Sequence, residues 1–111
     1  MSVRYTQLAE QMIESLSAVV DAAVSTGDVG GALSTARHKA NEAFSCAVTL
    51  LVLLDEYADR QFLSTALQDA RHTLEAIPAW GAEEWGDYHR ADVGRNASSA
   101  IVTLRMYIAK G

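Results

Sequence analysis

The sequence contains only one cysteine and one proline, and each scarcity excludes a class of structure. A single cysteine cannot form an internal disulfide, so the chain is not a disulfide-stapled scaffold. Cys46 lies in an apolar stretch without a basic neighbour that would activate its thiol, and we expect it to be a buried core residue. One proline and seven glycines in 111 residues leave few helix interruptions. The composition therefore favours helix.

Long apolar runs are also missing. Residues 43–54 carry no charge, glycine or proline, but this run is well short of the roughly 20 apolar residues that a transmembrane helix needs. Residues 1–7 lack the basic and then apolar layout of a signal peptide. We therefore expect a cytoplasmic protein with no membrane contact.

Basic residues are few. Nine Lys and Arg stand against 14 Asp and Glu, and the formal net charge is −5. Such a surface disfavours non-specific binding to nucleic acid or anionic membrane, so we predict no direct nucleic-acid partner. The basic residues of the C-terminal part are Arg90, Arg95, Arg105 and Lys110, against only Asp92. A nucleic-acid contact through these residues is the weaker alternative.

No catalytic motif is present. The chain lacks Gly-x-Ser-x-Gly, Cys-x-x-Cys, His-Glu-x-x-His and a phosphate-cradling glycine-rich turn. Lys39 directly follows His38, whereas histidine-phosphotransfer bundles carry their lysine three residues after the phosphorylated histidine. We therefore predict a protein that is not an enzyme, with no catalytic residue and no cofactor.

Hydrophobic periodicity predicts four helices and no strand. We expect the helices at residues 3–24, 32–57, 60–77 and 92–109. Asp28 is the predicted cap of the second helix, and the alternative starts of the second and fourth helices are Ser34 and Asn96. The predicted fold class is all-α: a small antiparallel four-helix bundle, a single domain over residues 1–111, with a long aromatic and acidic loop before the last helix.

The boundary between the second and third helices is marked only by charge. Charged residues return over residues 55–60, and Asp59 is the predicted cap of the third helix. A helix that continued from Ala32 to Ile77 would be about 70 Å long. Only a dimer or a larger assembly could cover such a rod, so this break controls the topology.

Residues 43–54 are apolar on every side of the expected helix. One hypothesis makes this the central helix of the bundle, with neighbours all round. In the other, Leu50, Val52, Leu53 and Leu54 cannot all be inside one protomer, and a two-fold homodimer covers the exposed part. Both hypotheses remain open from the sequence.

The expected loop at residues 79–90 gathers both tryptophans with a tyrosine and several acids. Tryptophan and tyrosine dominate binding hot spots because they bury a large area with few rotamers to freeze. The acids suit a basic partner, including a nucleic-acid-binding protein. The predicted partner-binding residues are Trp80, Glu83, Glu84, Trp85, Asp87 and Tyr88. Alternatively, the tryptophans close one end of the bundle.

Pairs of histidine and carboxylate residues raise the alternative of a metal site. His38 and Glu42 are four residues apart, and Asp69 and His72 are three apart, so each pair shares a helix face. The expected interior positions hold leucine, valine and alanine instead. We therefore predict solvated polar faces and no metal site.

Together these features predict a small, acidic, non-catalytic protein-interaction module that binds a protein partner and blocks or adapts it. Inhibitors, immunity proteins and phage antidefence proteins such as anti-CRISPRs have this size and charge, which is a likeness of class only. The alternatives are a self-assembling structural or adaptor subunit that dimerises through the second helix, and a helical metal-binding protein.

Overall fold

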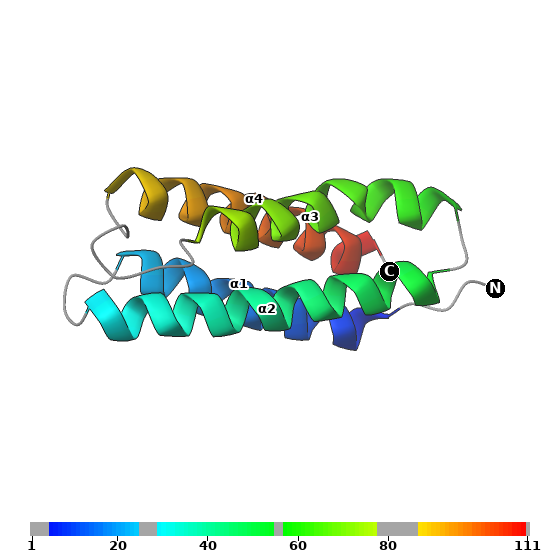
Figure 1. The fold of residues 1–111 in the computed structure, drawn as a ribbon. Helices are drawn as coiled ribbons and strands as arrows, with labels where there is room; N and C mark the ends of the chain where they lie inside the picture. Colours follow the sequence, from blue (N-terminus) through cyan, green and yellow to red (C-terminus); the bar gives the residue numbers. More distant parts are fainter. Residues whose placement is uncertain (1–4, 25–28, 55–56, 78–86, 111) are drawn as a thin grey trace.

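The structure is a computed structural model that describes residues 5–24, 29–54, 57–77 and 87–110. These ranges form four helices and no strand: α1 (Thr6–Val24), α2 (Val29–Leu53), α3 (Tyr57–Ala76) and α4 (Asp87–Lys110). The predicted all-α fold of four helices is confirmed. The molecule measures 49 × 21 × 18 Å, and successive helices run in alternating directions along its long axis (Figure 1).

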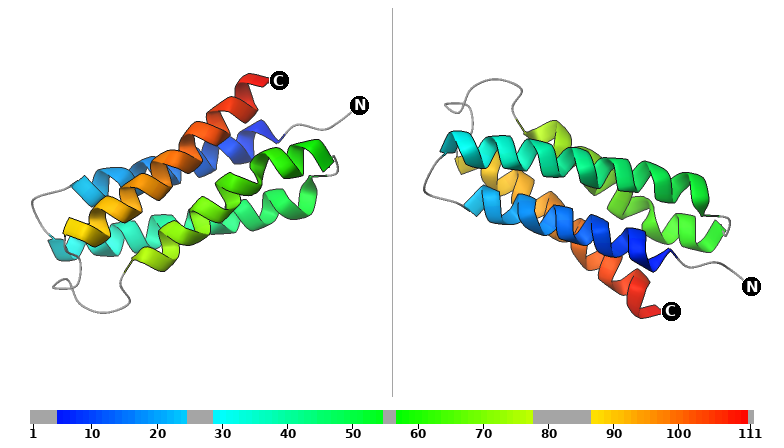
Figure 2. Two further views of the ribbon diagram at one scale, coloured as in Figure 1. Left: turned by 90° about the horizontal axis from the view of Figure 1, so that it is seen from above. Right: turned by 90° about the horizontal axis from the view of Figure 1, so that it is seen from below.

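The helices form two layers, with α1 beside α2 and α3 beside α4 (Figure 2). Between the layers, α1 packs against α4 and α2 packs against α3. Each helix therefore has two main neighbours and one side that faces solvent. The hypothesis that α2 is an enclosed central helix is wrong.

Alanine and leucine build most of the packing face of α2. Its buried residues recur every third or fourth position, which is the period of one helix face. They are Leu33, Ala36, Ala40, Ala43, Ala47 and Leu50, followed by Leu54 just beyond the helix. The larger apolar residues between these positions, such as Val48 and Val52, lie on other sides of the helix and are exposed.

The structure confirms the break between α2 and α3 and moves several boundaries. α2 begins at Val29 and ends at Leu53, so it starts and stops earlier than predicted. Since α3 begins at Tyr57, Asp59 is not its cap; it lies in the first turn and is buried. An acid in the first turn is favourable because it faces the positive end of the helix dipole. Asp28, the predicted cap of the second helix, lies outside the described residues.

The start of α4 lies well before the predicted position. Val93 is completely buried and begins the stripe that Ala97, Ala100 and Leu104 continue. The helix begins at Asp87, so it includes part of the stretch that was predicted to be a loop.

Candidate functional site

Most of the predicted partner-binding residues lie outside the part of the chain that the structure describes. These are Trp80, Glu83, Glu84 and Trp85. Asp87 and Tyr88 belong to the first turn of α4, so the prediction that they lie in a loop is wrong. The prediction that these six residues bind a partner stays a prediction.

Large apolar side chains are exposed where α2 ends and α3 begins. We name these residues the α2 apolar surface: Val48, Leu51, Val52 and Leu53 near the end of α2, and Tyr57 at the start of α3. Val52 and Tyr57 are 77% and 76% exposed, and the other three are between 38% and 46% exposed. Exposed large apolar residues that lie near one another in the fold make this end of α2 a candidate interaction site.

This surface arises because the solvent-facing stripe of α2 changes from polar to apolar residues along the helix. Asn41 and Ser45 come first in this stripe, and Val48 and Val52 follow at the same helical spacing. A stripe that faces solvent is ordinarily polar throughout. Its last turns therefore present side chains that this chain alone does not cover.

The sequence identified the stretch but not the side of the helix that is exposed. Of the residues that could not all be inside one protomer, Leu50 and Leu54 are buried and Val52 and Leu53 are exposed. The alanines of the buried stripe are the signal that separates the two sets, because they mark the side on which another helix approaches.

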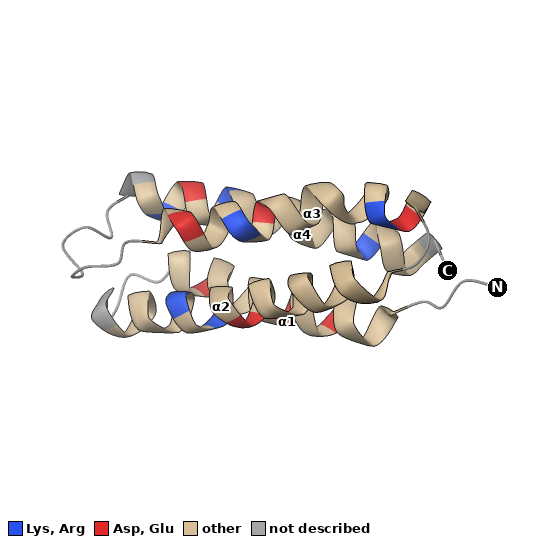
Figure 3. Cartoon of the chain, turned by 45° about the vertical axis from the view of Figure 1, so that its right-hand side comes forward, with Lys and Arg blue, Asp and Glu red and all other residues tan. Residues whose placement is uncertain are grey.

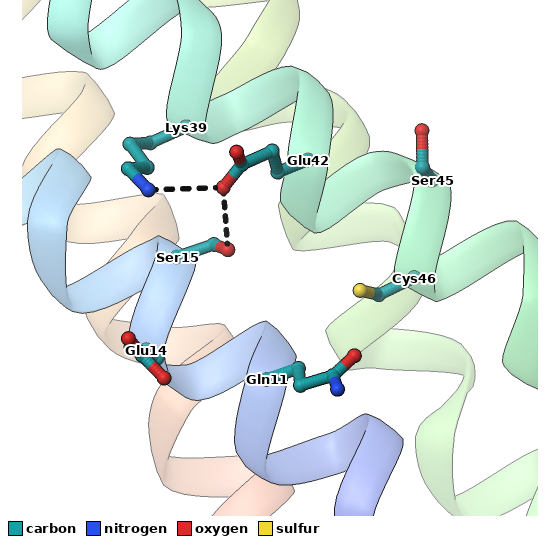
Figure 4. Close-up of a pocket in the computed structure, with 7 residues that line it drawn as sticks. All are labelled: Gln11, Glu14, Ser15, Lys39, Glu42, Ser45 and Cys46. Atoms are coloured by element: carbon teal, nitrogen blue, oxygen red, sulfur yellow. Dashed lines mark hydrogen bonds and ion pairs between the residues drawn. The ribbon is translucent and has the colours of Figure 1, made fainter.

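A polar groove of about 390 Å³ lies between α1 and α2 (Figure 4). Within this groove, Glu42 Oε2 accepts a hydrogen bond from Ser15 Oγ at 3.3 Å and another from Lys39 Nζ at 3.1 Å. His38 Nε2 lies 3.0 Å from Glu42 Oε1. The hydrogen bond from Lys39, together with the charges of Lys39 and His38, lowers the pKa of Glu42 below its usual value, although burial opposes the shift.

Cys46 also lines this groove and is only partly buried, which corrects the prediction of a buried core residue. Burial raises the pKa of its thiol, and the negative charge of Glu42 raises it further. Both effects disfavour the thiolate, which is the reactive form of cysteine. The groove therefore contains no activated nucleophile among the described residues.

The residues of the metal-binding alternative either bond to other side chains or lie on a different helix. Glu42 is held by Lys39 and Ser15, and Asp69 and His72 lie on α3. Among the described residues, no three histidines, cysteines or carboxylates lie close enough together to hold a metal ion.

The arginines of α4 are spread along the helix. Arg90 and Arg95 line one groove against α1, and Arg105 lines another. At 1.5 Å per residue, Arg90 and Arg105 are about 22 Å apart along the axis. Arg95 also lies 3.7 Å from the carboxylate of Asp92. These residues form no compact basic patch.

No protein-family model, curated protein or solved structure matches the chain. Within the described ranges, no helix combines the length and the apolar character that a membrane span requires.

Proposed function

We propose that the protein is a non-catalytic protein-interaction module that binds a protein through the α2 apolar surface and thereby blocks or adapts its partner in the cytoplasm. The observation that carries this proposal is the exposure of Val52 and Tyr57, together with their apolar neighbours, on regular helices. Inhibitors, immunity proteins and phage antidefence proteins act in this way, by occupying a partner's surface.

The area of the α2 apolar surface supports a specific contact. Its five residues expose roughly 550 Å² between them, which is within the size range of the apolar patches that mark interaction sites on protein surfaces.

The polar groove between α1 and α2 supports a catalytic function less well. Glu42 is engaged by Lys39 and Ser15, and the pKa of the Cys46 thiol is raised. A groove that served as an active site would need the opposite arrangement, with a free base and an activated nucleophile.

Site-specific photo-crosslinking in the cells that produce the protein tests the proposal. A photoreactive amino acid replaces Val52 in one variant and Val24 in a matched control. Val24 is also a valine near the C-terminal end of a helix and is 70% exposed. We expect a protein adduct from position 52 and none from position 24. The absence of an adduct at position 52, or equal adducts at both positions, would contradict the proposal.

A further inference from the structure

We propose that the groove between α1 and α4 around Gly94 binds a small organic carboxylate, with its apolar body against α1 and its carboxylate at Arg95. The groove has a volume of about 460 Å³, within the roughly 300–1,000 Å³ typical of small-molecule sites. It lies where α1 ends and α4 begins, at the opposite end of the bundle from the α2 apolar surface (Figure 1). The inference therefore goes beyond the proposed function.

The hollow exists because position 94 is a glycine. Gly94 and Ile101 are seven residues apart, so they lie on the same side of α4, and both line grooves against α1. Ile101 is buried and fills this seam, whereas Gly94 has no side chain to fill the equivalent place two turns earlier. A Cβ atom added at Gly94 would lie in open space, with no atom of another helix within 4 Å.

Neither the backbone nor the packing of the chain requires glycine at position 94. Among the described residues no glycine has a positive φ, and no helix approaches Gly94 closely enough to exclude a side chain. A glycine inside a helix is destabilising relative to alanine, so it has a cost here without a benefit in the chain itself. Close approach of a ligand to the backbone is a use of glycine that fits this position.

The charges that line the groove favour an anion. Arg90 and Arg95 line it, and among the described residues no Asp or Glu does. Figure 3 shows acidic positions but no Lys or Arg on α1, so both cations come from α4. By contrast, the neighbouring groove with Arg105 also contains Asp21. Within a chain of formal net charge −5, this groove therefore attracts a negative group.

Arg95 has the geometry to hold a carboxylate. Its side chain is 73% exposed, and its Nη1 lies 3.7 Å from Asp92 Oδ1, farther than the roughly 2.7–2.9 Å of a charge-assisted hydrogen bond. The guanidinium presents its N–H donors in a planar fork that matches a carboxylate. Arg95 can therefore bind a second carboxylate while Asp92 stays nearby.

The remaining lining selects an apolar body for the ligand. α1 contributes Val20, Ala23 and Val24, and the side chains beside Gly94 on α4 include the small Ala91. Small-molecule sites commonly combine such an apolar lining with a few polar groups that fix the orientation. Octanoate joins an apolar chain to one carboxylate, so it is a suitable probe.

Titration of the ¹⁵N-labelled full chain with octanoate, followed by NMR, tests the inference. We expect saturable shifts of the Gly94 and Val20 amide signals, with a dissociation constant below about 1 mM. At the same concentration, 1-octanol, which lacks the charge, and acetate, which lacks the apolar chain, should each produce less than about a fifth of these shifts.

Two pairs of variants test the roles of the groove and of the arginine. Gly94→Leu should fill the groove and weaken octanoate binding at least tenfold, whereas Ser99→Leu places the same side chain at an exposed position on another side of α4 and should leave binding unchanged. Arg95→Gln should weaken octanoate binding at least fivefold. Its control, Arg71→Gln on α3, should have no effect.

Circular dichroism checks that each variant keeps its helices. If Gly94→Leu loses helicity, Gly94→Ala replaces it. Because its Cβ atom would lie in open space, Gly94→Ala should fold, melt at a higher temperature than wild type and still bind octanoate more weakly.

Several outcomes would overturn the inference. They are shifts that do not saturate by about 10 mM octanoate, equal shifts from 1-octanol, unchanged binding in Arg95→Gln, and shifts gathered around Val52 instead of Gly94. A protein adduct from position 24 in the crosslinking experiment would also overturn it, because it would show that a protein covers this groove.

Discussion

The backbone N–H of Tyr5 donates a hydrogen bond to the hydroxyl oxygen of Tyr107, 3.2 Å away. The bond ties the residue that precedes α1 to the last turns of α4. Tyr107 is completely buried, so its ring also fills the core at this end of the bundle. One side chain thus stabilises both the entry of the chain into α1 and the packing between α1 and α4.

We expect Tyr107→Phe to lower the free energy of unfolding by about 0.5–1.5 kcal/mol, because the ring stays and the acceptor of the Tyr5 N–H is lost. The matched control is Tyr57→Phe. Tyr57 is 76% exposed, and its substitution should change stability by less than about 0.5 kcal/mol. Urea unfolding followed by circular dichroism measures both values, and equal effects would contradict the role of the hydrogen bond.

α1 could be predicted from the sequence because its polar and apolar faces are clearly separated. The predicted end at residue 24 agrees with the structure, and the predicted start lies three residues before Thr6. In α2, Gly30 and Gly31 suggested a later start, since each glycine costs about 1 kcal/mol relative to alanine in a helix. The burial of Leu33 and Ala36 overrides this penalty, and such tertiary packing is not visible in local propensity.

The candidate site could be predicted only in part. A stretch that is apolar on every side has no periodicity, so residues 43–54 could not reveal which side faces solvent. The spacing of Ala43 and Ala47 contains that information, but it becomes readable only once the neighbouring helices are in place. In the second candidate, the aromatic and acidic stretch, the part from residue 79 to 86 with both tryptophans lies outside the described residues.

Glu42 makes the stability of the protein sensitive to pH, chiefly through its hydrogen bond with Lys39 within α2. Its pKa is lowered in the folded state, so its contribution is present above the usual value of 4.5 and is lost as the pH falls through the lowered pKa. We therefore expect Glu42→Gln to be less stable than wild type at pH 7, and the difference to shrink as the pH falls below 4.5. Urea unfolding at a series of pH values measures this difference.

A matched control for this experiment is Glu75→Gln. Glu75 pairs with Arg71 at 2.8 Å within α3, where both side chains are exposed. Both glutamates pair within their own helix, but Glu42 also accepts a hydrogen bond from Ser15 on α1, so the substitution of Glu75 should have the smaller effect. A difference between Glu42→Gln and wild type that stays constant from pH 7 to pH 3 would contradict the role of Glu42.

Cys46 should react slowly with alkylating reagents in the folded protein. Its thiol is partly buried, and burial together with the charge of Glu42 raises its pKa, so little thiolate is present at pH 7.5. We expect alkylation by iodoacetamide to be at least several-fold slower in buffer than in 6 M urea. In Glu42→Gln the reaction should be faster than in wild type. Mass spectrometry follows both rates, and equal rates in buffer and urea would contradict the placement of Cys46.

The predicted contact through the aromatic and acidic residues is tested with Trp80→Ala/Trp85→Ala. If these tryptophans bind a partner, the double variant keeps the helicity of wild type and captures at least tenfold less of that partner from a lysate of the producing cells. If they instead close one end of the bundle, the variant loses helicity, because removing buried tryptophans costs about 3–5 kcal/mol each. The same capture measured with Val52→Lys shows which of the two surfaces binds the partner. Capture that depends on Val52 and survives the loss of both tryptophans would assign binding to the α2 apolar surface alone, and would contradict a role for Trp80 and Trp85.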